Sequence, residues 1–162
     1  MRKWLALAAL IVVADQFTKY AVVQYFAANK AVALAPFVNL VLVYNPGAAF
    51  SFLSNAAGWQ RGFFIAIALI ASAWIVFLLR KYPNERRFAL ALTLVLAGAV
   101  GNAIDRIFVG AVVDFVDVHA LGYHWPAFNV ADSAITCGAA LLIWDALRPQ
   151  AKVEPTTGTQ GQ

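Results

Sequence analysis

Apolar residues occur along this chain in four long runs, separated by shorter stretches in which polar residues gather. The runs cover about residues 4–26, 59–79, 88–108 and 130–147. Each run is close to the roughly 20 residues that a helix needs to cross a bilayer. The pattern predicts a bundle of four transmembrane helices that forms a single domain over residues 1–148.

The segment between the first two runs, residues 27–58, lacks a helical pattern. Residues 34–43 are rich in Val and Leu, which predicts one or two short strands. They lead into Asn45-Pro46-Gly47, a strong turn signal. A small β-rich segment is therefore expected in an otherwise all-α membrane protein.

The composition agrees with a membrane protein. Hydrophobic residues make up 62% of the chain and charged residues only 12%, against roughly 25% charged residues in soluble domains. The net charge of +4 requires no nucleic-acid partner, because basic residues at the cytoplasmic ends of membrane helices produce such a balance. Residues 149–162, rich in Pro, Thr and Gly, are expected to form a disordered cytoplasmic tail.

Basic residues mark one side of the predicted bundle. They precede the first run, fill the link between the second and third, and follow the fourth, as Arg2, Lys3, Arg80, Lys81, Arg86, Arg87, Arg148 and Lys152. The segments expected on the other side contribute only Lys30 and Arg61. By the positive-inside rule both termini are cytoplasmic, and residues 27–58 and 109–129 lie outside.

The first run has a second interpretation, as a secretory signal peptide. Two basic residues, an apolar core and small residues before Asp15 fit that pattern. The apolar pattern resumes after Lys19 and continues to Phe26, however. A retained first helix is therefore the favoured interpretation.

Polar residues interrupt two of the runs. Asp15 and Lys19 have the i,i+4 spacing that places opposite charges on one helical face, which indicates a neutralising pair or a direct part in binding. Asn102, Asp105 and Arg106 share a face of the third run. Asn102 and Arg106 are either structural or donors that hold a carboxylate or a substrate carbonyl, and Asp105 is interpreted as a charge balance for Arg106.

The second external segment and the start of the fourth run carry several possible metal ligands. Asp114, Asp117, His119 and His124 precede Asp132, and His and carboxylate groups commonly bind metals. The spacing matches no specific zinc pattern, so a metal site remains a weak alternative. No cofactor is predicted.

The pair Asp114 and Asp132 favours peptide hydrolysis. Two carboxylates held close together share one proton, so one member activates water while the other polarises the scissile carbonyl. Asp132 lies at the predicted start of a helix, where the helix dipole favours the ionised form. We expect Asp132 to be the base and Asp114 the acid.

Five blocks in this order resemble the bacterial lipoprotein signal peptidases (signal peptidase II), a family of four-span aspartic peptidases of the inner membrane. The blocks are Asp15 with Lys19, Asn45-Pro46-Gly47-Ala48-Ala49-Phe50-Ser51, Gly101-Asn102-Ala103-Ile104-Asp105-Arg106, Val112-Val113-Asp114-Phe115 and Phe128-Asn129-Val130-Ala131-Asp132-Ser133. The resemblance covers about residues 1–147.

The resemblance implies a function and a site. Asp114 and Asp132 would be the catalytic pair. The substrate-binding positions would be Asn45, Asn102, Arg106 and Asn129. The substrate would be a prolipoprotein that carries diacylglycerol on its lipobox cysteine, cut just before that cysteine at the periplasmic side of the membrane.

The resemblance also implies two external features and leaves the choice of function open. Residues 34–53 would form a periplasmic β-rich cradle, and a short helix within 109–128 would cover the site. Besides the bilayer and the substrate, no obligatory protein partner is inferred. The alternatives are a small proton-coupled transporter or channel that uses the same carboxylates as a relay, and an anchoring protein without chemistry.

Overall fold

The computed structural model describes residues 1–26, 31–47 and 58–148. Within them the chain forms four long helices, α1 (Arg2–Tyr25), α2 (Trp59–Lys81), α3 (Arg86–Phe108) and α4 (Val130–Leu147). Each is long and apolar enough to cross a membrane. The bounds of these helices agree with the four predicted runs to within two residues at every end. The predicted tail at 149–162 and residues 48–53 of the predicted cradle lie outside the described part.

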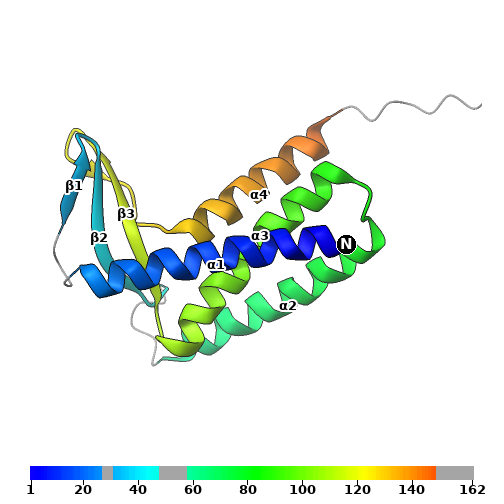
Figure 1. Cartoon of the computed structure of the whole chain (residues 1–162), viewed down its shortest axis with the longest axis horizontal. Coiled ribbons are helices and arrows are strands. Elements are labelled where there is room, and N and C mark those ends of the chain that lie inside the picture. The colour runs from blue at the N-terminus through cyan, green and yellow to red at the C-terminus, as the bar shows by residue number, and fades with distance from the viewer. Residues whose placement is uncertain (27–30, 48–57, 149–162) are drawn as a thin grey trace, which may run out of the picture.

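The described strands form one small antiparallel sheet at one end of the helices (Figure 1). In order across the sheet they are β1 (Val32–Ala35), β2 (Val38–Asn45), β3 (Val112–Ala120) and β4 (Tyr123–His124). The first two confirm the strands expected within residues 34–43. The sheet therefore joins the hairpin between α1 and α2 to the strands between α3 and α4.

The short helix expected within residues 109–128 is wrong, because that segment forms β3 and β4. Its sequence is rich in valine, and β-branched residues suit a pleated surface better than a helix. The edge of β2 then supplies backbone partners, with Asn39 opposite Asp117 and Val43 opposite Asp114. Pairing between distant segments decides the structure here.

Helix α3 is the central helix of the bundle, and α1, α2 and α4 each pack along it. Its contact with α4 is the most extensive and depends on glycine. A Cβ at Gly98 would collide with the carbonyl oxygen of Ala131, and a Cβ at Gly101 would lie 2.7 Å from Oδ2 of Asp15. Small residues thus bring three helix backbones close together near the start of α4.

Two clusters of packed apolar side chains stabilise the two ends of the molecule. At the end remote from the sheet, a cluster that includes Trp4, Leu79 and Leu92 joins α1, α2 and α3. At the other end, Val22 of α1 packs against Val113 and neighbouring sheet residues. The sheet is therefore held on the end of α1, which positions the polar residues of β3 over the helix bundle.

Candidate active site

Asp114 is a buried carboxyl group in the sheet that lies at one end of the helices (Figure 1). Its side chain on β3 is only 1% exposed. Oδ2 accepts a hydrogen bond from Nδ2 of Asn45 at 3.0 Å, and Oδ1 accepts one from Nδ2 of Asn129 at 2.7 Å. Both oxygens of this carboxyl group are thus oriented by asparagine amides.

The surroundings of Asp114 favour its protonated form. Burial raises the pKa of Asp114 to about 6, because the charged carboxylate loses its hydration. The amide hydrogen bonds from Asn45 and Asn129 oppose this rise, whereas the nearby negative charge of Asp132 adds to it. Asp114 is therefore a carboxyl group that can hold a proton near neutral pH.

Asp132 stands in the first turn of α4, as the sequence predicts. Its backbone N–H donates to Oδ1 of Asn129 at 2.9 Å, and its Oδ2 accepts from the backbone N–H of Asn129 at 3.3 Å. This reciprocal pair is a capping box that begins the helix. Oδ1 of Asp132 accepts a third hydrogen bond from Nδ2 of Asn102 at 2.8 Å. The half-buried carboxylate thus accepts two hydrogen bonds, and the backbone N–H of Asp132 makes the third contact.

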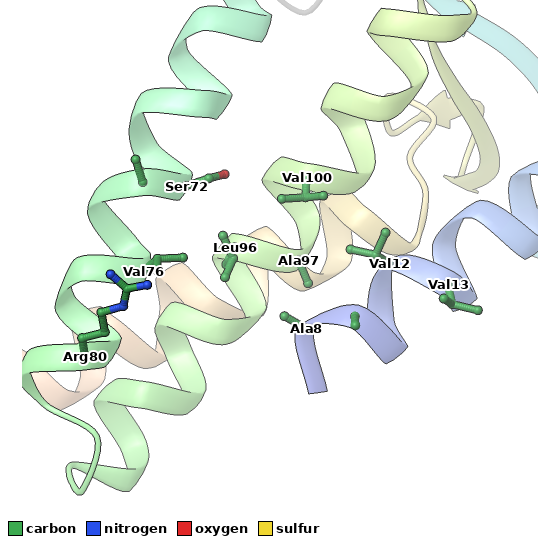
Figure 2. Close-up of a pocket in the computed structure, with 11 residues that line it drawn as sticks. Ala8, Val12, Val13, Ser72, Val76, Arg80, Leu96, Ala97 and Val100 are labelled. Atoms are coloured by element: carbon green, nitrogen blue, oxygen red, sulfur yellow. The ribbon is translucent and has the colours of Figure 1, made fainter. Parts of the chain in front are cut away.

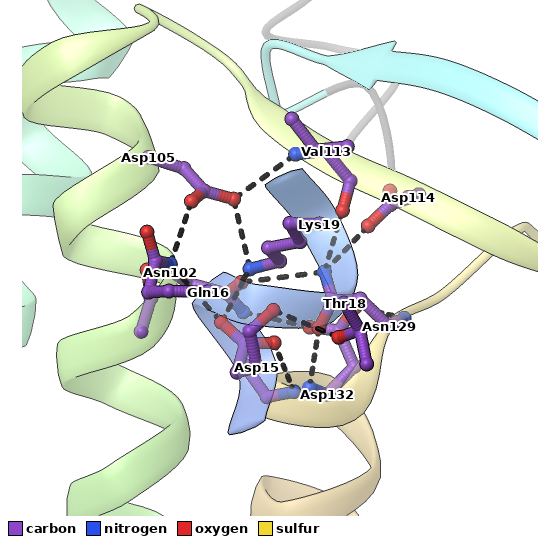
Figure 3. Close-up of polar contacts among 12 residues, drawn as sticks. Asp15, Gln16, Thr18, Lys19, Asn102, Asp105, Val113, Asp114, Asn129 and Asp132 are labelled. Atoms are coloured by element: carbon purple, nitrogen blue, oxygen red, sulfur yellow. Dashed lines mark hydrogen bonds and ion pairs between the residues drawn. The ribbon is translucent and has the colours of Figure 1, made fainter. Parts of the chain in front are cut away.

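Asn129 connects the two aspartates (Figure 3). Its amide nitrogen donates to Asp114, while its amide oxygen and backbone nitrogen both bond to Asp132. Asn129 is itself 1% exposed. The chain thus brings together two carboxyl groups from β3 and α4 around one buried amide.

A buried ion cluster lies behind the aspartates and joins α1 to α3. Nζ of Lys19 lies 2.9 Å from Oδ2 of Asp15 and 2.8 Å from Oδ2 of Asp105. It also donates to Oδ1 of Asn102 at 3.0 Å. The predicted pairing of Asp15 with Lys19 is confirmed, and the lysine turns the amide of Asn102 so that its nitrogen faces Asp132.

Two members of this cluster were not expected from the sequence as site residues. Asp105 pairs with Lys19 and accepts a hydrogen bond from the backbone N–H of Val113 at 3.1 Å, next to Asp114. Gln16 donates to Oδ1 of Asp105 at 2.9 Å. Asp105 shares a helical face with Asn102, and this spacing could have indicated that it belongs to the site. The sequence prediction instead paired Asp105 with Arg106.

Arg106 lies at the same end of α3 as Asn102 and Asp105. One guanidinium nitrogen, Nη1, donates to the carbonyl oxygen of Asn102 at 3.1 Å, and the guanidinium lies 4.9 Å from the ring centre of Phe64. Its buried Nε has no hydrogen-bond partner in the described part of the chain. The protein encloses this nitrogen, while the Arg106 side chain as a whole is half-buried.

A cavity of about 470 Å³ opens beside Asp132. Asn45 and Phe128 line it at the sheet end, and Ser133 and Cys137 line it along α4. Nδ2 of Asn45 reaches Asp114, while its Oδ1 accepts from the backbone N–H of Gly47 in the turn after β2. A ligand in this cavity would therefore touch the hydrogen-bonded network of both aspartates.

The other possible metal ligands lie apart from the two aspartates. Nδ1 of His124 is 2.9 Å from Oδ1 of Asp117, and the rings of His119 and His124 stack with their centres 5.0 Å apart. Asn39 donates to the second oxygen of Asp117. Among residues 1–26, 31–47 and 58–148 no three His, Cys, Asp or Glu side chains are grouped so as to hold a metal.

Sequence comparison gives a consistent result along nearly the whole chain. The family model described as signal peptidase (SPase) II matches residues 7–148. The lipoprotein signal peptidase of Paraburkholderia phymatum is 53% identical over 145 residues, which are 90% of this chain and 87% of that protein. The protein of the same name from Janthinobacterium sp. (strain Marseille) is 52% identical over 148 residues, 91% of this chain and 90% of that protein.

Two solved structures of bacterial membrane enzymes, both determined by the in meso method, have the same fold. The one at 1.9 Å resolution superposes with a TM-score of 0.82 at 34% identity, over 93% of this chain and 96% of that chain. The one at 2.3 Å gives 0.81 at 33% identity, over 95% and 96%. The helices and the sheet therefore form a fold that is shared with these membrane enzymes.

Proposed function

We infer how this molecule works from the premise that the chain belongs to the signal peptidase II family. It is a multi-pass membrane protein and an aspartic-type endopeptidase that processes prolipoproteins. The transporter alternative is not favoured, since the relatives that match nearly the whole chain are peptidases. The roles of individual residues, the side of the membrane and the details of the substrate are our proposals.

The catalytic pair is Asp114 and Asp132. The observation that supports it is the bridge through Asn129, whose amide bonds to both residues. The raised pKa of Asp114 supports its role as the protonated acid. Asp132 then acts as the base, with its two carboxylate oxygens oriented by the side-chain amide of Asn102 and the backbone N–H of Asn129.

Hydrolysis proceeds by general acid–base catalysis. A water molecule attacks the scissile carbonyl carbon while Asp132 takes one of its protons and Asp114 gives its proton to the carbonyl oxygen. The tetrahedral intermediate then collapses. The C–N bond breaks, Asp132 returns its proton to the leaving amine, and Asp114 recovers a proton from the intermediate. The residues of the pair end in their starting states, and no cofactor enters the cycle.

The substrate-binding residues surround this pair. Asn45 orients Asp114 from the cavity side, and Asn102 and Asn129 orient Asp132. Arg106, at the same end of α3, binds a substrate carbonyl through its guanidinium group, which the carbonyl oxygen of Asn102 orients. Asp15 and Lys19 act behind them as a structural pair that holds Asn102 in place.

The substrate is a diacylglyceryl-modified prolipoprotein, cleaved just before the lipidated cysteine. The site lies at the sheet end of the helices, next to the membrane edge. There the acyl chains of a substrate remain in lipid while its peptide reaches the aspartates. Exposed apolar side chains beside β4, namely Leu121, Tyr123 and Trp125, suit a sheet that rests on the membrane surface.

The protein lies in the bacterial inner membrane with both termini in the cytoplasm and the sheet on the periplasmic side. The N-terminus, the α2–α3 link and the end of α4 all lie opposite the sheet (Figure 1). The indole nitrogen of Trp4 donates to the carbonyl oxygen of Pro83 in that link, which joins two of these basic regions. The positive-inside rule places this end in the cytoplasm.

The test measures cleavage of a lipidated precursor by purified protein. Asp114→Asn and Asp132→Asn each remove one carboxyl group with little change in shape, and we expect both to abolish cleavage while the protein stays folded. Asp117→Asn is the matched control on the same strand and should cleave normally. Retained cleavage in either of the first two variants would exclude this pair. For the transporter alternative, ion flux rather than precursor length would respond to the same changes.

A further inference from the structure

A second cavity lies in the half of the bundle remote from the sheet (Figure 2). It is a groove of about 740 Å³ between α1 and α2, with α3 as its floor. Ala9 and Val13 line it from α1, Ala73 and Val76 from α2, and Leu96 from α3. None of the proposed site residues is among the described residues that line the groove, so the groove is separate from the proposed active site.

The groove is apolar and ends at a cation. Arg80 is the one charged residue among its described lining residues. Figure 2 shows its side chain turned along α2 toward Val76. Within the described part of the chain Arg80 forms no ion pair. A ligand with an apolar tail and a negative head would match both parts of the groove.

The length of the groove is close to the thickness of the hydrocarbon layer of one membrane leaflet. Arg80 stands next to the last residue of α2, and Ser72 lines the groove eight residues earlier. At the rise of a helix this spacing is about 12 Å, close to half of the roughly 30 Å hydrocarbon core. The groove thus runs from the membrane edge to about the middle of the bilayer.

We propose that this groove binds an anionic phospholipid, with an acyl chain between α1 and α2 and its phosphate at Arg80. In the proposed orientation the lipid comes from the cytoplasmic leaflet. Basic sites between membrane helices on that side recognise lipid headgroups by the same charge complementarity. The lipid fills the space between two helices that each pack on α3, and so supports the half of the bundle that lacks a sheet.

Charge disfavours the two other occupants that could enter from the membrane. The signal helix of a precursor begins with basic residues at this depth, which Arg80 would repel. A second copy related by a two-fold axis along the membrane normal would bring its own Arg80 to the same depth. An anionic lipid has the opposite charge and meets no such repulsion.

Native mass spectrometry of the delipidated full chain in detergent tests this site. The probes are phosphatidylglycerol and phosphatidylcholine with identical acyl chains. We expect one phosphatidylglycerol to bind about fivefold more tightly than phosphatidylcholine, the effect expected of one basic residue near a headgroup. Arg80→Gln should remove this preference and Arg80→Lys should keep it. Lys81→Gln, at the same helix end but outside the groove, is the matched control.

Filling the groove gives a second and independent test. Ala73→Phe and Val13→Trp should each weaken the binding of both lipids, whereas Ala66→Phe, an exposed position of α2 outside the groove, should not. Precursor cleavage by Arg80→Gln should persist, which separates this site from the proposed function. Lipid affinities that are unchanged in Arg80→Gln and in both filling variants would overturn the proposal. Displacement of phosphatidylglycerol by saturating precursor, or a dimer that the filling variants dissociate, would assign the groove to another occupant.

Discussion

Oδ1 of Asp15 accepts a hydrogen bond from the backbone N–H of Ala131 at 2.8 Å. An acidic side chain of α1 thus satisfies one of the free N–H groups at the start of α4. Ala131 directly precedes Asp132 in the chain. The position of the proposed catalytic base therefore depends on a residue more than a hundred positions earlier, and on the lysine that neutralises it.

Lys19→Met is expected to destabilise the folded protein by about 3–5 kcal/mol, because it leaves two buried carboxylates, Asp15 and Asp105, without their cation. Thermal unfolding in detergent measures the loss. Adding Asp105→Asn should recover part of it, since one uncompensated charge is then removed. Lys3→Met, which changes an exposed lysine of the same helix, should have little effect. Equal unfolding temperatures for Lys19→Met and Lys3→Met would contradict the prediction.

Asn129→Ser separates the two tasks of Asn129. Serine is also a good residue at the start of a helix, so the cap on α4 is retained. The amide donor to Asp114 is lost, and we expect kcat to fall about 100-fold, as misplaced catalytic groups do, with KM nearly unchanged. Asn39→Ala removes a similar amide from Asp117 and should leave kcat intact. A variant with wild-type kcat would show that the bridge is not needed.

Gly98→Ala should disturb both stability and activity. The added Cβ meets the carbonyl oxygen of Ala131 and lies 2.5 Å from Cγ1 of Ile135, so α4 must shift and carry Asp132 with it. Overpacking of this kind costs about 1–3 kcal/mol. Gly62→Ala is the control, because a Cβ there meets nothing within 4 Å. Unfolding temperature and kcat, measured together, should fall for the first variant only.

The stability of the protein should depend on Asp114 between about pH 4 and about pH 6. Burial raises the pKa of Asp114 from 3.8 to about 6, so in this range the folded protein binds the proton more tightly than the unfolded chain. Its contribution to the free energy of unfolding therefore falls as the pH rises, by up to about 3 kcal/mol, and is constant above the folded pKa. Asp114→Asn should gain stability relative to wild type over the same range.

Asp117→Asn provides a control of opposite sign. The hydrogen bond from Asn39, and then that with His124, lowers the pKa of Asp117. Its stabilising contribution is present above the unfolded pKa and is lost as the pH falls through the folded pKa. Unfolding temperatures across the pH range, for wild type and both variants in one detergent, measure the two trends. Parallel curves for Asp114→Asn and wild type would refute the Asp114 prediction.

Much of this fold could be predicted because its signals are local. The apolar runs predict α1 to α4 nearly to the residue, since the cost of polar groups in lipid acts on each segment separately. The i,i+4 spacing of Asp15 and Lys19 predicts their ion pair for the same reason. By contrast, β3 forms because the edge of β2 lies beside it, and a covering helix was expected there instead.

By itself, the sequence determined the four spans, the basic end of the bundle and which carboxyl groups stand out. Only the tertiary structure decided that Asp114 is buried, that Asn129 bridges it to Asp132 by hydrogen bonds, and that Asp105 forms an ion pair with Lys19. It also decided the groove that ends at Arg80. The physical reason is that the free energy of transfer into lipid, and the face on which a helical residue lies, are set by residues that are close in the sequence. The meeting of side chains from α1, α3, β3 and α4 depends on how closely their backbones pack.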